Sequence, residues 1–303
     1  MSELFLNKAG EQLLTQLRLI FQQKRIYHAK TRPIMFVCGG DLSEGAASLR
    51  KQFTEWAGAN LSDFVCLMAE EALKQNLDES ERTFVNLATF ESVIADIADC
   101  VLIFPEGPGS YAETGFFANS RVRNKALVIN KLSLQAAESF LNLGPIETIS
   151  SYSFLKPTVL VNAPPGVDFT DLAQRLRQRV VPLQHRQSIP YQRFGKFNFK
   201  QKLLIVFEVL RLLRLADVKT LRYVLQECFG GSPKYQELKH LLRILLAAKF
   251  IQRQGDTQYF KVTPDLVLVE IEHLEVEKMF SVVNFFYQKY SQELYGFLQE
   301  VAS

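Results

Sequence analysis

The stretch FPEGPGSYAETGFF, residues 104–117, joins the end of an apolar segment to a glycine-proline turn and then to a helical pattern. The residues CVLIF at 100–104 are apolar throughout, which is typical of a strand buried on both faces. A buried strand that ends in a glycine turn and continues into a helix is the repeating unit of a parallel α/β sheet. The stretch therefore predicts an α/β fold with this turn at the carboxyl edge of the sheet.

The same pattern recurs on both sides of this stretch. Helical patterns at 44–59 and 84–99 alternate with further apolar segments, which are PIMFVCGGD at 33–41, FVCLMA at 64–69, KALVIN at 125–130 and PTVLVNA at 157–163. Apolar strands that alternate with helices indicate a doubly wound, mostly parallel sheet covered on both faces. Such sheets bind ligands beyond the carboxyl ends of their strands. The glycine turns at 38–41 and 106–109 both fall there.

The length of 303 residues predicts two domains. We expect an N-terminal helix at 1–30, the α/β domain at 31–165, a proline-containing connector at 166–195 and a mainly helical domain at 196–303. In the last, three helical segments precede a strand, a Gly255-Asp256 turn and a second strand. This is the order of a winged helix, whose third helix is the recognition helix. We expect the aromatic face of the C-terminal helix to pack on its own protein or on a second copy.

The positive charge is concentrated in one region. Residues 186–261 carry fifteen Lys or Arg and five Asp or Glu, a net charge of +10, although the whole chain carries only +3. Such an excess on a helical module is typical of nucleic-acid binding. A solvated face or a protein contact would also fit it. The predicted contacts, mostly to phosphate, are Lys234, Lys239, Arg243, Arg253 and Lys261.

Cysteines and histidines give no sign of a disulfide framework or a metal site. Cys38, Cys66, Cys100 and Cys228 are far apart and have no zinc spacing, which favours a cytoplasmic protein. No stretch approaches the roughly 20 apolar residues of a membrane span, so we expect no membrane association. The histidines lack neighbouring ligands, so we expect neither a metal nor a cofactor; they are His28, His185, His240 and His273.

The two glycine turns predict a phosphate cradle. Backbone N–H groups in glycine turns and the positive ends of helices bind phosphate. Glycine could equally serve only the tightness of the turns. Neither turn is GxGxxG or a Walker A loop, which argues against a dehydrogenase or an ATPase. The predicted substrate-binding residues are Gly39, Gly40, Asp41, Gly107, Gly109 and Ser110.

Two carboxylates flank the second turn. Glu106 stands at the end of the strand, and Glu113 follows the glycine loop. Such a pair beside a phosphate suits cleavage of an N-glycosidic bond: one carboxylate stabilises or attacks the oxocarbenium-like carbon, and the other polarises a ribose hydroxyl or activates water. Alternatively, Ser110-x-x-Glu113 matches a capping box, in which both side chains satisfy N–H groups of the first helical turn. No helix cap requires Glu106.

CGGD at 38–41 and PEGPGSYAETGFFAN at 105–119 resemble nucleoside-deoxyribosyltransferase-like and related nucleotide-processing domains. There, a variant of PxGxGSxxE opens a helix, and its glutamate is the catalytic carboxylate. The resemblance implies that role for Glu113, with Glu106 near a supporting acidic residue. It also assigns residues 107–110 to a ribose-phosphate loop and 39–40 to a first phosphate turn. With the resemblance, we favour catalysis over capping for Glu113.

The whole architecture is similar to effector proteins of bacterial retron anti-phage systems. The resemblance implies an effector held by a reverse transcriptase and its branched RNA–DNA product, msDNA, in a higher-order assembly. It also implies toxicity through nucleotide cleavage, with NAD as the preferred substrate and hydrolysis favoured over base transfer, since no second base site is specified. The residues leave one alternative: a winged-helix DNA-binding regulator whose α/β domain senses a nucleotide without turnover.

Overall fold

The computed structural model describes residues 3–29, 31–40, 48–75, 86–134, 138–162, 166–181, 187–231 and 233–299. The chain divides into two compact units. The α/β unit contains Arg32–Glu71 and Phe84–His185, and the helical unit contains Met1–Thr31, Ala72–Thr83 and Arg186–Ser303.

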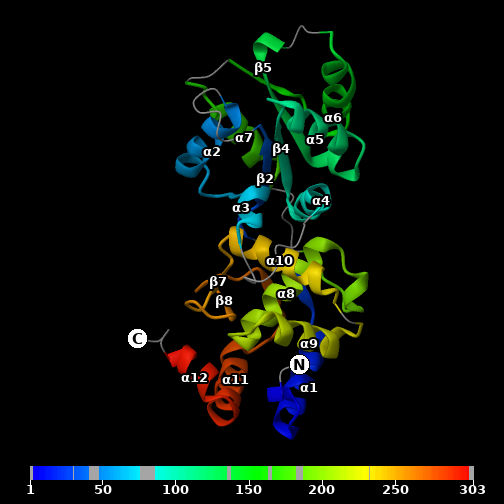
Figure 1. Ribbon diagram of the computed structural model, residues 1–303. Coiled ribbons are helices and arrows are strands. Elements are labelled where there is room, and N and C mark those ends of the chain that lie inside the picture. Colours follow the sequence, from blue (N-terminus) through cyan, green and yellow to red (C-terminus); the bar gives the residue numbers. More distant parts are fainter. Residues whose placement is uncertain are drawn as a thin grey trace. The chain divides into compact units, whose positions relative to one another are not determined.

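Five parallel strands form the sheet of the α/β unit, in the spatial order β3-β2-β4-β5-β6 (Figure 1). Their bounds are β2 Ile34–Gly39, β3 Val65–Leu67, β4 Cys100–Phe104, β5 Ala126–Lys131 and β6 Val159–Val161. The predicted α/β fold with a parallel sheet is confirmed. Strand order reverses between β2 and β4, and in doubly wound sheets ligands bind at such a switch point. Both glycine turns follow these two strands.

Helices cover both faces of this sheet (Figure 1). On one face, α2 (Leu49–Asn60) and α7 (Thr170–Arg179) pack together, and the rings of Phe53 and Phe169 lie 5.3 Å apart. On the other face lie α4 (Leu87–Ile97), α5 (Pro108–Ala118) and α6 (Glu147–Tyr152). Although α7 falls within the segment predicted as a connector, its apolar residues are buried in the core of this unit.

The helical unit contains α8 (Phe199–Leu213), α9 (Val218–Phe229) and α10 (Tyr235–Ala247), followed by an antiparallel hairpin. Its strands are β7 (Ile251–Arg253) and β8 (Phe260–Val262). The predicted order of three helices and a hairpin is confirmed. Asp217 caps α9 by accepting the N–H of Thr220 at 2.7 Å. Gly255 has a φ of +55° in the hairpin turn, which favours glycine.

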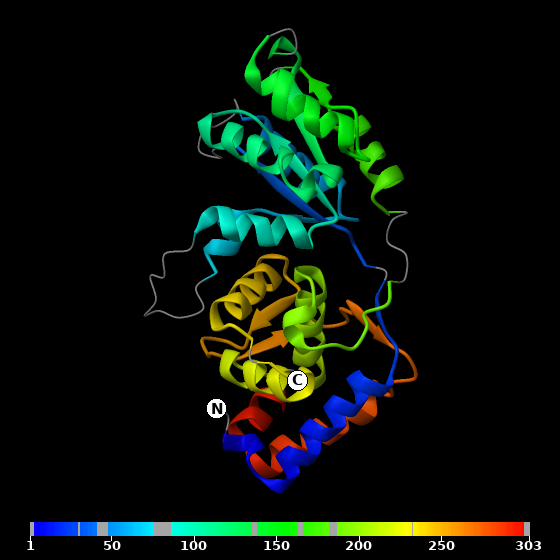
Figure 2. The same ribbon diagram turned by 90° about the vertical axis from the view of Figure 1, so that its right-hand side faces the viewer.

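The two ends of the described chain also pack within the helical unit. The N-terminal helix α1 (Lys8–Gln23) packs along α9 and lies beside α11 (Val276–Tyr290), as Figure 2 shows. A short strand that sequence analysis did not predict, β1 (Ile26–His28), pairs with β9 (Val269–Ile271). These contacts connect residues 3–29 to the rest of the helical unit.

The C-terminal segment forms two helices rather than the single long helix that we predicted. The first, α11, ends before Ser291, and α12 spans Gln292–Gln299. Tyr287 on α11 is fully buried, and its hydroxyl lies 3.1 Å and 3.0 Å from the carbonyl oxygens of Leu213 and Leu215. Part of the aromatic face therefore packs on its own chain, as expected.

The described residues contain neither a candidate membrane span nor a candidate metal site. No helix there combines the length and the hydrophobicity that a membrane span requires. No group of three His, Cys, Asp or Glu side chains in the described ranges is arranged to hold a metal ion. His185 lies outside those ranges.

Candidate active site

Glu106 follows β4 and caps the N-terminus of α2. Its carboxylate accepts hydrogen bonds from the N–H groups of Leu49 at 2.6 Å and Arg50 at 3.1 Å, and from the hydroxyl of Ser48 at 3.0 Å. The Lys131 ammonium lies 3.7 Å away, and the Glu106 side chain is 3% exposed. A helix N-terminus favours a carboxylate through its free N–H groups and its dipole. Our interpretation that no helix cap requires Glu106 is therefore wrong.

Ser110 and Glu113 do not form the predicted capping box. Because α5 begins at Pro108, the N-cap is Gly107 and Ser110 is the third helical residue. The buried Ser110 hydroxyl accepts the N–H groups of Glu106 at 2.9 Å and Gly107 at 3.0 Å. These hydrogen bonds occupy the Ser110 hydroxyl, which we had predicted to contact a phosphate. They also leave Glu113 in the body of the helix, where it is not folded back onto a cap.

Glu113 is the carboxylate with an unused oxygen. Its Oε2 is buried and has no hydrogen-bond partner among the described residues. Burial and the charges of Glu91 and Glu70 raise the pKa of Glu113 to about 8, although Arg50 acts in the opposite direction. Buried polar atoms are almost always hydrogen-bonded, and carboxylates with strongly shifted pKa values are frequent at functional sites. Glu113 therefore has the features of a functional residue.

Arg50 enters the same region from α2 and is 2% exposed. Its guanidinium donates two hydrogen bonds to Glu70, at 2.7 Å and 2.8 Å. It also donates to the carbonyl oxygens of Val37, Gly39 and Gly40. The Nε of Arg50 is buried and finds no acceptor in the described part of the chain. Arg50 thus holds the end of β2 and places a positive charge beside the carboxylates.

Glu91 and Cys38 complete this region. Burial, with the charge of Glu70, raises the pKa of Glu91 to about 7, while Arg50 opposes the shift. Burial, followed by the charges of Glu113 and Glu91, raises the pKa of the Cys38 thiol. Cys38 therefore stays a thiol at neutral pH, which argues against a nucleophilic thiolate. We call Glu70, Glu91, Glu113 and Arg50 the carboxylate cluster.

The two glycine turns differ in their surroundings. A Cβ atom on Gly39 would lie 2.6 Å from the carbonyl oxygen of Phe104, and one on Gly40 would lie 2.9 Å from the Cβ of Glu106. At Gly107 and Gly109 a Cβ would meet no described atom within 4 Å. Packing alone thus explains the first turn, whereas the second borders open space. Phosphate binding by either turn stays a prediction, and Asp41 lies outside the described residues.

The five cations predicted to contact nucleic acid are not equally accessible. Lys234 is exposed, whereas Arg253 and Lys261 on the hairpin are half-buried. Lys239 is 1% exposed, with its ammonium 4.5 Å from the ring centre of Tyr235. Arg243 is 7% exposed, and its Nε donates to the carbonyl oxygen of Gln75 at 3.3 Å. The structure therefore leaves three of the five open to a partner, and Lys239 and Arg243 are not surface groups.

The fold and the carboxylate cluster define an α/β protein with a candidate active site at the switch point of its sheet. Residues 46–253 match the family described as STM3845 retron effector protein. This match covers more than half of the chain, and the chain belongs to this family. Family membership links the chain to a retron defence system.

Two curated relatives from Escherichia coli carry the provisional name ribosyltransferase/DNA-binding protein. The one from retron Ec86 is 28% identical over 155 residues, which cover 50% of this chain and 48% of the relative. The one from retron Ec73 is 28% identical over 124 residues, which cover 40% of this chain and 39% of the relative. The chain thus spans half or less of the length of the curated relatives it matches.

Sequence reasoning did not find Glu70, Glu91 or Arg50. One signal was present: Glu91 lies between Phe90 and Ile94 on the apolar face of the helical pattern at 84–99, and a charge on such a face indicates a paired or functional group. Arg50 and Glu70 gave no comparable signal, because Arg and Glu are ordinary residues near helix ends. Only the three-dimensional arrangement brings the four side chains together.

Proposed function

We propose that this chain hydrolyses the N-glycosidic bond of a nucleotide, with NAD as the substrate and Glu113 as the principal catalytic carboxylate. The observation that carries the proposal is the buried Oε2 of Glu113, which has no hydrogen-bond partner among the described residues and follows the open glycine turn at 107–109 by four to six residues. The switch point of a doubly wound sheet is where ligands bind in this class of fold. The word ribosyltransferase in the relatives' names supports chemistry at a ribose.

Glu113 would act on the ribose as a carboxylate. In the free protein its pKa of about 8 keeps most of it protonated at neutral pH. The nicotinamide ring of NAD carries a positive charge, and a nearby opposite charge favours the ionised form. When the bond from C1′ to nitrogen breaks, its electron pair leaves with nicotinamide, and the carboxylate stabilises the oxocarbenium-like ribose. Water then attacks C1′ and loses its proton to Glu113 or solvent, which yields ADP-ribose.

Arg50 and Glu106 would position the reacting groups. The buried Nε of Arg50 has no described acceptor and could donate to a ribose hydroxyl. Glu106 was a predicted catalytic carboxylate, and its hydrogen bonds to the first turn of α2 favour a positioning role instead. Hydrolysis is proposed over base transfer because the described residues give no reason to assign a second base site.

We further propose that the α/β unit is nucleoside-deoxyribosyltransferase-like and that the helical unit is a winged-helix module. Its partners would be a retron reverse transcriptase and the msDNA, held in the cytoplasm in a higher-order assembly. The helix-helix-helix-hairpin order, the net charge of +10 at 186–261 and the exposed Lys234 support this assignment. In this arrangement the nucleic acid would control access to the nucleotide activity.

The test is the release of nicotinamide from NAD by the full chain, alone and with a retron reverse transcriptase and its msDNA, followed by mass spectrometry. We expect Glu113→Gln to lower turnover by about 10²- to 10⁴-fold, the contribution typical of a positioned acid–base group. The matched control is Glu55→Gln on α2, whose side chain is exposed. It should retain full turnover, and both variants should keep the wild-type melting temperature at pH 7 within a few degrees.

Full activity of Glu113→Gln would remove this residue from the mechanism. If the assembled wild-type protein consumes no nucleotide but binds one DNA sequence specifically, the chain is a DNA-binding regulator that senses a nucleotide. Cleavage of another nucleotide with the same dependence on Glu113 would keep the mechanism and change the substrate.

A further inference from the structure

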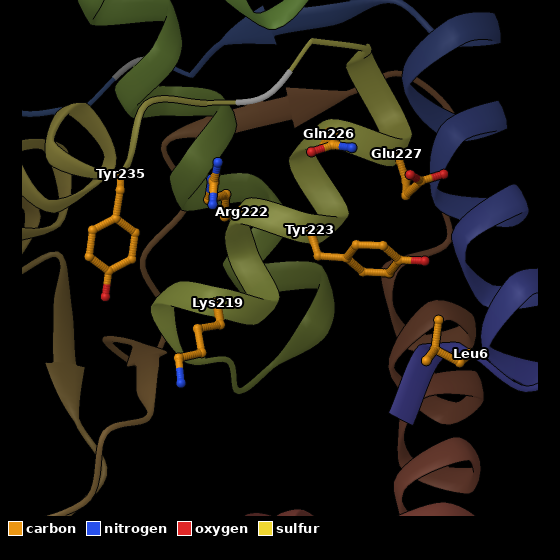
Figure 3. A pocket seen from close by; sticks show the side chains of 7 residues that line it. All are labelled: Leu6, Lys219, Arg222, Tyr223, Gln226, Glu227 and Tyr235. Atoms are coloured by element: carbon orange, nitrogen blue, oxygen red, sulfur yellow. The ribbon is translucent and has the colours of Figure 1, made fainter. Parts of the chain in front are cut away.

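A cavity of about 470 Å³ opens on the exposed side of α9 in the helical unit. Its volume lies within the range of about 300–1,000 Å³ that is typical of ligand sites. As Figure 3 shows, most of the lining side chains project from α9, with Tyr235 on one side of them and Leu6 on the other. The α9 residues are Lys219, Arg222, Tyr223, Gln226 and Glu227. None of them belongs to the carboxylate cluster or to the predicted phosphate contacts.

We propose that this cavity binds an unpaired nucleotide of a single-stranded nucleic acid, with Tyr223 and Tyr235 stacking on the base. The inference goes beyond the proposed glycosidase and does not depend on Glu113. Stacking on aromatic rings combined with nearby cations is the general way in which proteins hold single strands. A base inside a regular duplex is stacked on its neighbours and cannot enter such a cavity.

Both tyrosine rings are held by neighbours that keep them in place. The ring of Tyr223 lies 6.3 Å from the ring of Phe5, which is fully buried. The buried Lys239 ammonium lies 4.5 Å from the ring centre of Tyr235. Rings that are already ordered lose little conformational freedom on binding. Lys239, which we had predicted to contact phosphate, thus acquires the role of supporting a stacking residue.

The charges at the cavity favour an anion. Lys219 and Arg222 are exposed there, and the Nε of Arg222 donates to the carbonyl oxygen of Pro233 at 3.0 Å, which anchors its guanidinium. The single lining carboxylate, Glu227, lies 3.5 Å from the guanidinium of Arg18. Its negative charge is therefore largely offset, and the two cations on α9 determine the sign at the cavity.

The polar lining and its location also fit a nucleic-acid strand. Gln226 is exposed and has both an amide donor and an amide acceptor, as needed to hydrogen-bond to the edge of a base. Lys234 directly precedes Tyr235 and is exposed, so a strand with its base in the cavity could continue along a phosphate contact. A purely apolar peptide would leave these polar groups unused.

The experiment is fluorescence anisotropy with the full chain and a labelled 12-nucleotide oligothymidylate, with a blunt hairpin duplex and thymidine monophosphate as competitors. We expect the oligothymidylate to bind more tightly than the duplex. Tyr223→Leu and Tyr235→Leu should each weaken its binding by about 5- to 150-fold, while the Phe variants at both positions retain it. Tyr290→Leu on α11 is the matched control and should bind like the wild type.

A second variant keeps the test independent of folding, because Tyr223 also packs on Phe5. The exposed Lys219→Ala should lower the slope of log affinity against log salt by about 0.7, the value for one phosphate contact on a single strand. Lys278→Ala, with a side chain that is 79% exposed on α11, should leave the slope unchanged. Wild-type affinity in both Leu variants together with an unchanged slope in Lys219→Ala would overturn the proposal. If thymidine monophosphate displaces the oligonucleotide at concentrations equal to the dissociation constant of the oligonucleotide, the cavity binds free nucleotides instead.

Discussion

The turn after β4 and the body of α5 carry two glutamates from one short stretch, and their surroundings differ sharply. Glu106 has two backbone N–H groups, a hydroxyl and a lysine ammonium around its carboxylate. Glu113 has a buried oxygen with no described partner and a pKa of about 8. The Glu106 carboxylate is therefore well hydrogen-bonded, whereas the burial of the Glu113 carboxylate is energetically unfavourable.

This difference separates a structural charge from a functional one. A carboxylate with all its hydrogen bonds made stabilises the helix that donates them, and it has little remaining capacity for a substrate. A carboxylate that is buried without partners destabilises the fold, so it persists where its reactivity is used. By this criterion Glu113, and not Glu106, is the candidate for chemistry.

The largest effect is expected from removal of the hydrogen-bonded Glu106 carboxylate. Glu106→Ala would leave the N–H groups of Leu49 and Arg50 and the hydroxyl of Ser48 without their acceptor in a buried place. We expect the free energy of unfolding to fall by about 3–5 kcal/mol, as when one partner of a buried charged network is removed. Urea unfolding at pH 7 measures this loss.

The control for this change is Glu55→Ala, an exposed position on the same helix, which should stay within about 0.5 kcal/mol of the wild type. If Glu106→Ala is as stable as that control but no longer releases nicotinamide, then Glu106 acts on the substrate, and the structural assignment fails.

The strands and the carboxyl edge that holds the candidate site could be predicted because they depend on local patterns. Apolar segments and glycine turns predicted all five strands of the sheet and its carboxyl edge at the stretch 104–117. The roles of Glu106 and Ser110 could not be predicted in this way. The Glu106 carboxylate meets α2 more than 50 residues away in the sequence, and no local pattern encodes that contact. The N-cap of α5 is Gly107, three residues before the Ser110 that the capping motif indicated, and a capping motif alone does not determine this shift.

The α9 cavity was missed for the same reason. Its lining joins Leu6, α9 and the first residue of α10, and its tyrosines follow no motif. The burial of Lys239 and Arg243 also depends on tertiary contacts, because charge counts along a sequence do not distinguish a supporting cation from an exposed one.

A smaller effect should appear in the pH dependence of stability. The folded-state pKa of Glu113, about 8, lies above the value of about 4.3 in an unfolded chain. The native state thus binds the proton more tightly, so this contribution to stability is full below pH 4 and is lost as pH rises through 8. Glu113→Gln cannot ionise. As the pH rises from 5 to 9, we expect its free energy of unfolding to increase by about 1–3 kcal/mol relative to that of the wild type, as measured by urea unfolding.

The Glu91 carboxyl titrates in both proteins, and its charge acts on Glu113, so the difference between the two curves reports Glu113 together with its coupling to Glu91. Parallel stability curves for the wild type and Glu113→Gln would show that the Glu113 carboxyl has its ordinary pKa. In that case an unfavourable burial of its carboxylate would no longer distinguish Glu113 from Glu106.

The smallest effect on stability sharpens the comparison between the two glycine turns. Gly109→Ala adds a methyl group where no described atom lies within 4 Å, in the first turn of α5. Alanine favours a helix more than glycine does, so we expect the free energy of unfolding to increase by about 0.5 kcal/mol.

Gly39→Ala would instead place its Cβ 2.6 Å from a backbone oxygen and should destabilise the sheet. If the open turn receives the substrate, Gly109→Ala will lower kcat/KM for NAD despite its higher melting temperature. A stabilised variant with unchanged kcat/KM would mean that the substrate does not approach this turn.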